Sequence, residues 1–283
     1  MEKVFTRKFS FILVAFIYIF AGAVGVLSYF MFSTPFYLSL LFADIIATVV
    51  TFIFSVIFKN ASVYDPYWSV QPIVILVAFI IGYGFSLSVL FPLIAILFWG
   101  IRLTANWAYT FKGLTHQDWR YTMLNEKTGK FYPIINFIGI HLVPTLIVYG
   151  ATIPAVFVAV YKPQFNAYSL IFFALSILAV ILQGTADIEM HKFRKNPNGN
   201  FIRDGLWKYS RHPNYLGEIT MWWGIGGYLV ALIPSMWYLL VGALLNTVLF
   251  LVVSIPMADK RQAKKDGFSE YKKQTRMLFP IKK

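Results

Sequence analysis

The sequence predicts an all-α protein, a polytopic bundle of about eight transmembrane helices with both termini cytoplasmic. Composition is the first observation behind this prediction. Hydrophobic residues make up 58% of the 283 residues and charged residues 13%, and the mean hydropathy is +0.65. Soluble domains have roughly 45–50% apolar and 25% charged residues. The distributions of apolar runs and of basic residues are the second and third observations.

Eight apolar runs approach or exceed the roughly 20 helical residues that cross a hydrocarbon core. They cover residues 9–31, 36–58, 70–83, 91–111, 134–161, 168–188, 215–233 and 236–257. The first run is too long for the apolar core of a signal peptide and lacks a small-residue cleavage site, so a retained span is expected. No internal repeat or flexible linker divides the chain, which predicts a single integral membrane domain over residues 1–283.

Lysine and arginine residues gather at both ends of the chain and in the loops that follow the fourth and sixth runs. The loops on the other side offer only Lys162. Because short cytoplasmic loops carry the positive excess, this pattern places both termini in the cytoplasm. Basic loops against an anionic leaflet account for the net charge of +13. The expected partners are therefore the lipid bilayer and a hydrophobic small molecule, with no nucleic acid.

Cysteine is absent, which excludes disulfides, thiolate catalysis and cysteine-ligated metals. The four histidines fall in different segments and show no metal-binding spacing. No metal site is predicted.

The segment 205–218, GLWKYSRHPNYLGE, places polar and charged groups directly before an apolar run. Tyr215, Glu218 and Trp222 share one helical face. The face begins at a helix amino end, where free N–H groups favour an anionic ligand. We expect Glu218 to accept a hydrogen bond from a ribose hydroxyl or to pair with a basic residue.

A second polar stripe lies on the sixth run, where Gln183, Asp187 and His191 recur every four residues. Charged groups in a span face protein or a water-filled cavity. The stripe therefore indicates either a ligand site or a structural network between helices. On the fourth run, Arg102 either extends to the membrane interface or lines the same cavity.

Asp44 lies well inside the second run, and Asp65 and Tyr67 flank the turn before the third. A buried carboxyl group that stays protonated can serve as a proton donor. Asp44 could equally be paired with another side chain, and Asp65, which precedes Pro66, could be a turn residue. The candidate acids by position are Asp44, Asp65, Tyr67, Tyr109 and Asp118.

Several motifs occur in a characteristic order: RLTANW, QDWRY, ADIEMHKFR, GLWKYSRHPNYLGE followed by MWWG, IPMADK and EYKKQTRMLFP. Together they resemble the steroid 5-alpha-reductase-like membrane proteins, the DUF1295 group. This family is related to the sterol reductases and more distantly to the isoprenylcysteine carboxyl methyltransferases. The resemblance implies that the carboxyl-terminal half, roughly residues 168–283, binds NADPH. Cofactor contacts are expected from Arg102, Asp187, Lys192, Arg194, Arg211, His212, Asn214, Tyr215, Glu218 and Lys260.

The implied activity is NADPH-dependent reduction of a carbon–carbon double bond in a lipid-like substrate, such as a steroid or an enone. The Gln-Glu pair and catalytic tyrosine of the steroid 5-alpha reductases align with no motif here, so the candidate acids rest on position alone. An S-adenosylmethionine-dependent membrane methyltransferase is the alternative, although Asp259 and Lys260 replace the Glu-Glu pair of that group. A transporter or scaffold is a second alternative. The expected location is a bacterial inner membrane.

Overall fold

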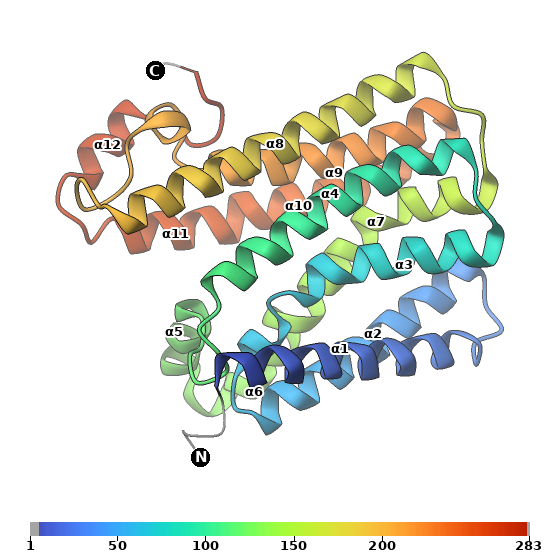
Figure 1. The fold of residues 1–283 in the computed structure, drawn as a ribbon, viewed down its shortest axis with the longest axis horizontal. Helices are drawn as coiled ribbons and strands as arrows, with labels where there is room; N and C mark the ends of the chain where they lie inside the picture. The colour runs from blue at the N-terminus through green and yellow to red at the C-terminus, as the bar shows by residue number, and fades with distance from the viewer. Residues whose placement is uncertain (1–5, 282–283) are drawn as a thin grey trace. The chain divides into compact units, whose positions relative to one another are not determined.

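The computed structural model describes residues 6–281, and the regular elements in this range are helices (Figure 1). Extended pairing in the described residues is limited to an isolated bridge between Ser210 and Arg276. Seven helical stretches of this part of the chain are long and apolar enough to cross a membrane. The predicted all-α polytopic bundle is confirmed.

The membrane-length stretches correspond to predicted runs. They are Arg7–Tyr29, Phe36–Ile57, Ala61–Tyr83, Leu87–Thr110, Trp119–Tyr161, Ala167–Lys195 and Pro234–Gln262. The remaining run, 215–233, forms α9 (Pro213–Leu232), which does not belong to this set. Twelve of its residues, Glu218 among them, are buried. A helix that contacts mainly protein can be less apolar than one that contacts lipid.

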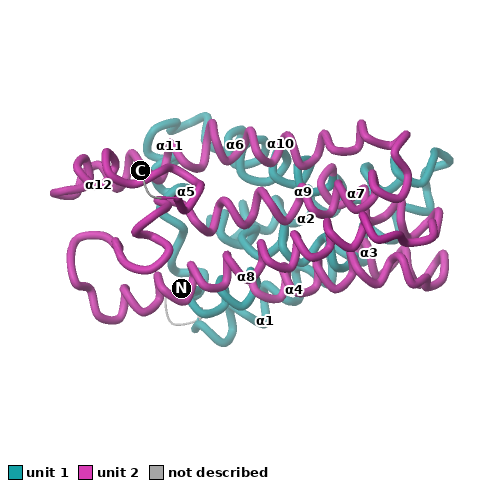
Figure 2. The backbone as a smooth tube through the Cα atoms, turned by 90° about the horizontal axis from the view of Figure 1, so that it is seen from above, with its two compact units in different colours: residues 1–74, 103–149 teal, residues 75–102, 150–283 magenta. Residues whose placement is uncertain are grey.

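The chain divides into two compact units (Figure 2). Unit 1 comprises residues 1–74 and 103–149, and unit 2 comprises residues 75–102 and 150–283. The helices α3 (Tyr67–Tyr83), α4 (Leu87–Thr110) and α7 (Val143–Tyr161) each contribute residues to both units.

Unit 1 is built on the pair α1 (Arg7–Tyr29) and α2 (Phe36–Ile57), which pack through small residues. A Cβ atom at Gly25 would lie 3.3 Å from the Cβ atom of Ala47, so the helices approach closely there. The other elements wholly within unit 1 are η1 (Ala61–Tyr64), α5 (Trp119–Thr128), η2 (Gly129–Phe131), α6 (Tyr132–Ile135) and the π-helical segment η3 (Asn136–Leu142).

Unit 2 is built on α8 (Ala167–Lys195) and α9, which run side by side. Asn166 and Ser169 form a capping box at the start of α8, and the helix ends before Pro197. The helix continues beyond residue 188, where the predicted apolar run ends. The other elements wholly within unit 2 are η4 (Gly205–Lys208), η5 (Pro234–Leu240), α10 (Val241–Leu249), the π-helical segment η6 (Phe250–Ser254), α11 (Ile255–Gln262) and α12 (Phe268–Gln274).

Glycines seven residues apart allow α8 and α9 to approach each other. A Cβ atom at Gly217 would lie 2.6 Å from the carbonyl oxygen of Ala179, and one at Gly224 would lie 2.9 Å from that of Phe172. Backbone lies opposite both positions, so an added methyl group would force the two helices apart.

We expect Gly224→Ala to destabilise unit 2 by about 1–3 kcal/mol, because the new methyl group overpacks the α8–α9 contact. The matched control is Gly22→Ala in α1, where no heavy atom lies within 4 Å of the added Cβ position. The control should be neutral or slightly stabilising, since alanine favours helix over glycine. Thermal unfolding in detergent compares the two, and equal midpoints would show that the α8–α9 approach is not tight.

Candidate functional site

The segment that precedes α9 is fixed by contacts to α8. Gly205 has φ +58°, and a Cβ atom there would collide with the carboxylate of Glu189. That carboxylate accepts a hydrogen bond from the backbone N–H of Leu206 at 3.0 Å. The indole of Trp207 donates to the carbonyl oxygen of Ala186 at 3.2 Å, and the ring is buried. Trp207 therefore lies in an internal contact.

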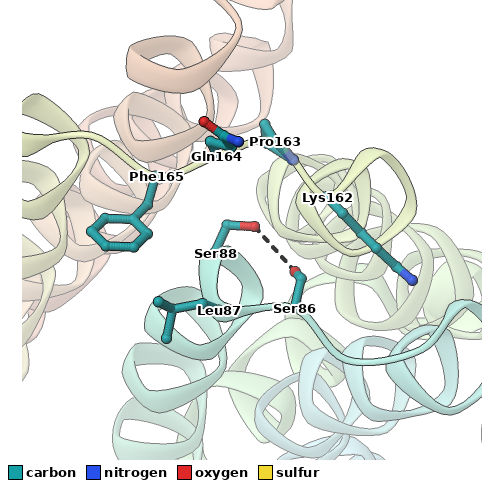
Figure 3. A pocket seen from close by; sticks show the side chains of 7 residues that line it. All are labelled: Ser86, Leu87, Ser88, Lys162, Pro163, Gln164 and Phe165. Atoms are coloured by element: carbon teal, nitrogen blue, oxygen red, sulfur yellow. Dashed lines mark hydrogen bonds between the residues drawn. The ribbon is translucent and has the colours of Figure 1, made fainter.

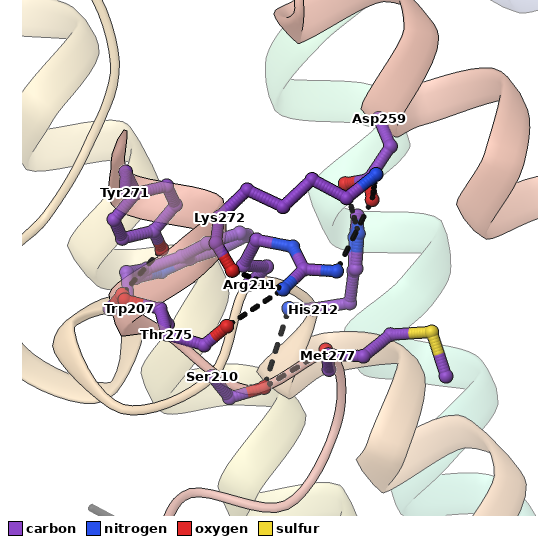
Figure 4. A network of polar contacts seen from close by, with 9 residues as sticks. All are labelled: Trp207, Ser210, Arg211, His212, Asp259, Tyr271, Lys272, Thr275 and Met277. Carbon is purple, nitrogen blue, oxygen red and sulfur yellow. Dashed lines mark hydrogen bonds and ion pairs between the residues drawn. The ribbon is translucent and has the colours of Figure 1, made fainter. Parts of the chain in front are cut away.

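Arg211 connects this segment to the carboxyl-terminal residues (Figure 4). Its backbone N–H donates to the carbonyl oxygen of Arg276 at 2.9 Å, and its Nη1 atom donates to that of Thr275 at 2.6 Å. Its Nη2 atom lies 3.2 Å from Oδ2 of Asp259. The guanidinium is 8% exposed and is largely committed to these internal partners. Arg211 therefore holds the segment that follows α12 in place through these hydrogen bonds.

Asp259 on α11 is the centre of this network, which we call the Asp259 network. Besides Arg211, its carboxylate contacts Nε2 of His212 at 3.0 Å and Nζ of Lys272 at 3.2 Å. The His212 ring stacks on the Tyr215 ring, with centroids 5.2 Å apart. One buried carboxylate thus meets three basic side chains. Charge-assisted hydrogen bonds of this kind offset the cost of burying charge.

Tyr271 on α12 extends the same contact. Its hydroxyl donates to the carbonyl oxygen of Trp207 at 2.5 Å, and its ring packs against Phe201 and Phe268. Burial raises the pKa of the Tyr271 hydroxyl, so it remains a neutral donor at physiological pH. The short helix α12 is held by apolar packing and by hydrogen bonds together.

A second polar group lies among α4, α8 and α9, and we call it the carboxylate cluster. It consists of Trp99, Arg102, Asp187, Glu218 and Trp222. Arg102 lies 2.5 Å from Asp187 and 3.8 Å from Glu218. The indole N–H groups of Trp99 and Trp222 donate to the two oxygens of Glu218 at 2.8 and 2.9 Å. The cluster therefore combines two carboxylates, one guanidinium and two indole donors from three helices.

Gln183 lies one helical turn before Asp187 and is fully buried. Neither its amide nitrogen nor its amide oxygen has a hydrogen-bond partner among the residues that the structure describes. The same is true of Nε of Arg102. Buried polar atoms in proteins are nearly always hydrogen-bonded. These atoms are polar groups beside the carboxylate cluster to which the described residues supply no partner.

The remaining candidates from the cofactor set are more accessible. The side chains of Lys192 and Arg194 on α8 and of Lys260 on α11 are exposed, and Asn214 near the start of α9 is partly buried. Exposed basic groups at helix ends can reach anionic groups of a ligand in water. Lys192, Arg194 and Lys260 are named the basic rim below.

The candidate acids form separate arrangements in unit 1. Tyr67 donates to Oδ1 of Asp44 at 3.1 Å, and Gln71 donates to the other oxygen of Asp44. The hydroxyl of Tyr121 donates to Asp65 at 2.6 Å. Gln71 and Tyr121 were not predicted from the sequence as partners of these carboxylates.

The other two candidates have simpler surroundings. Asp118 caps α5 by accepting from the backbone N–H of Arg120, and its carboxylate lies 2.8 Å from Nε of the same residue. Tyr109 is 54% exposed. All five candidate acids belong to unit 1, and all ten candidate cofactor residues belong to unit 2.

A pocket of about 320 Å³ lies in unit 2, where α4 and α8 begin (Figure 3). Its lining includes Ser86 and Ser88, whose hydroxyls lie 3.1 Å apart. The carboxylate cluster lies further along both helices, at Arg102 and Asp187. The pocket contains none of the predicted site residues, and we assign it no function.

Comparison with known proteins matches residues 51–275 to the family model described as a protein of unknown function, DUF1295. An uncharacterized protein of Schizosaccharomyces pombe is 26% identical over 246 residues, which cover 77% of this chain and 70% of the relative. No solved structure matches this chain. The matched residues include the whole carboxylate cluster and Asp259.

Proposed function

This chain belongs to the DUF1295 family of membrane-spanning helical proteins, and from that premise we propose that it is an NADPH-dependent reductase. The substrate is a lipid-like molecule with a reducible carbon–carbon double bond. The observation that carries the proposal is the carboxylate cluster together with the unpartnered amide of buried Gln183. In the proposed location, a bacterial inner membrane, the basic rim faces the cytoplasm.

The residues of unit 2 match the chemical groups of the cofactor. A buried carboxamide such as Gln183 offers an NH2 group that donates and a carbonyl oxygen that accepts, which complement the carboxamide of a nicotinamide. Asp187 and Glu218 offer carboxylate acceptors for hydroxyl groups. The basic rim offers cations for phosphates. When bound, NADPH supplies a hydride to the double bond.

The Asp259 network gives the reductase more support than the methyltransferase. Arg211, His212 and Lys272 all contact the carboxylate of Asp259. A carboxylate so neutralised offers little attraction to the sulfonium of S-adenosylmethionine. In the reductase, Arg211 and His212 position the residues around α12, and direct phosphate contacts come from the basic rim.

We expect Lys192→Ala to weaken NADPH binding by about tenfold, equivalent to about 1.4 kcal/mol, because one charge-assisted contact to a phosphate is lost. Lys130→Ala in unit 1 is the matched control, since it removes an exposed lysine outside the basic rim. Equilibrium titration in detergent, followed by tryptophan fluorescence, gives the two dissociation constants. The same titration with NADH shows whether Lys192 contacts the phosphate that NADPH has and NADH lacks, or the diphosphate that both cofactors share.

Two outcomes would count against the proposal. Equal NADPH affinity in the Lys192→Ala and wild-type proteins would remove this residue from the site. An absence of NADPH binding to the folded wild-type protein would overturn the reductase. If uptake of a solute into vesicles then depended on the protein, a transporter would be the better description.

A further inference from the structure

Unit 1 contains a continuous series of hydroxyl groups that ends on a carboxylate. The Tyr64 hydroxyl lies 2.8 Å from Oγ1 of Thr145, which lies 3.0 Å from Oγ1 of Thr48. Thr48 lies 3.5 Å from the Tyr67 hydroxyl, and Tyr67 lies 3.1 Å from Oδ1 of Asp44. We call these four hydroxyl groups, with Asp44 at their end, the hydroxyl chain. It joins residues of α2, η1, α3 and α7.

The direction of these hydrogen bonds follows from the number of protons. An ionised Asp44 can only accept, so Tyr67 donates its single hydroxyl proton to it. Tyr67 then accepts from Thr48, which has no second proton to donate and must accept from Thr145. By the same argument, Thr145 accepts from Tyr64. Every hydroxyl donates towards Asp44, an alignment in which neighbouring hydrogen bonds strengthen one another.

Burial keeps bulk water away from the chain. Thr48 and Thr145 are fully buried, and Tyr64, Tyr67 and Asp44 are each 7% exposed or less. A proton that reaches Asp44 by this route must pass from hydroxyl to hydroxyl. Each hydroxyl can do so because it is both a donor and an acceptor.

Two unpartnered acceptors lie beside the chain. Gln71 donates to Asp44 through its amide nitrogen, while its Oε1 atom has no partner among the described residues although the side chain is buried. His141 is fully buried, and its Nδ1 lies 3.0 Å from the carbonyl oxygen of Asn136, which assigns the proton to Nδ1. Its Nε2 is therefore an acceptor, also unpartnered among these residues. The His141 ring lies 4.6 Å from that of Tyr64.

We propose that the hydroxyl chain is a proton relay that reloads Asp44 from the Tyr64 end, for a polar ligand bound by Asp44 and Oε1 of Gln71. In the step, the carboxyl O–H bond of Asp44 breaks as a basic atom of the ligand takes the proton. The carboxylate then takes the proton of Tyr67, and each hydroxyl is refilled by the next. The last proton, that of Tyr64, is replaced by a single internal water held by the unpartnered Nε2 of His141. One proton moves from water to the ligand, and no electrons are transferred. This inference goes beyond the proposed reductase and does not require NADPH.

Other titratable groups lie near the chain and must be separated from it in any measurement. They are Tyr18 of α1, Asp65 after η1, Tyr121 of α5, His141 of η3 and Tyr149 of α7. The carboxyl group of Asp44 is distinguished from that of Asp65 by its loss in Asp44→Asn.

The test follows protonation of Asp44 in the full-length protein in lipid nanodiscs. Time-resolved infrared spectroscopy records the carboxyl band that Asp44→Asn removes, after a rapid drop from alkaline to acidic pH. We expect Thr48→Val to slow the appearance of this band by at least about tenfold, because a missing hydroxyl breaks the transfer path. Thr51→Val is the matched control, since Thr51 is buried on the same helix and its hydroxyl donates only to the carbonyl oxygen of Ala47.

Further variants keep the test independent of folding. Tyr64→Phe should slow the appearance of the band as Thr48→Val does. Tyr18→Phe should leave this rate unchanged, because the Tyr18 hydroxyl donates to the carbonyl oxygen of Val63. Thr48→Ser restores a hydroxyl and should restore the rate. Wild-type rates in Thr48→Val and Tyr64→Phe, or no Asp44 band at any pH, would overturn the relay. Because no cofactor is added, failure of the relay is distinct from failure of NADPH binding.

Discussion

Substituting Asp259 by alanine is expected to destabilise unit 2 by about 3–5 kcal/mol, the usual cost of removing one partner from a buried ion pair. Arg211 and His212 would remain buried without the carboxylate that both contact. Lys272 on α12 would also lose its partner. We therefore expect the segment 268–281 to detach from α11 before the rest of unit 2 unfolds.

Thermal unfolding and limited trypsin digestion measure the two effects. Cleavage after Lys272 and Lys273 should become faster in Asp259→Ala than in the wild type, because α12 is no longer held. Glu270→Ala is the matched control, since it removes an exposed carboxylate of α12 that lies 3.8 Å from Lys273. An exposed pair contributes about 0–1 kcal/mol. Wild-type stability and digestion in Asp259→Ala would show that the Asp259 network does not hold this segment.

Substituting Arg102 by glutamine is expected to have a comparable effect, a loss of about 3 kcal/mol or more, because Asp187 and Glu218 lose the cation near them. The same change should abolish measurable NADPH binding, since the carboxylates would then repel an anionic cofactor. Thermal unfolding and titration give the two quantities separately.

A second substitution distinguishes charge from packing at this position. Adding Glu218→Gln to Arg102→Gln removes one of the uncompensated carboxylates and should recover part of the lost stability. Arg194→Gln, at an exposed position on α8, is the control and should leave stability within about 0.5 kcal/mol of the wild type. No recovery in the double variant would indicate that Arg102 acts through packing alone.

The fold could be predicted because long apolar runs leave few alternatives to membrane-spanning helices. The end of α8 at Lys195, beyond the apolar run, agrees with the position of Pro197, because proline cannot continue a helix. The close approach of α8 to α9 could not be predicted. The positions of Gly217 and Gly224 indicate a helix contact only when the rotation of each helix about its axis is known. The division into two units likewise depends on contacts between distant segments.

The sequence indicated which residues are polar members of a site more successfully than it indicated which residues they contact. Arg211 was expected to contact the cofactor, yet its partners Asp259 and Thr275 lie 48 and 64 positions away along the chain. Trp99 was missed although it precedes Arg102 by three residues and shares its helical face. Asp44 and Tyr67 were identified separately, and the structure joins them by a hydrogen bond. Pairing between helices depends on register, which a single sequence does not encode locally.

Equilibrium titration of the purified wild-type protein with NADPH and with S-adenosylmethionine tests whether unit 2 binds NADPH. We expect saturable binding of NADPH, weakened in Lys192→Ala and lost in Arg102→Gln, with no competition from S-adenosylmethionine. Tight binding of S-adenosylmethionine to a folded protein that does not bind NADPH would contradict this expectation.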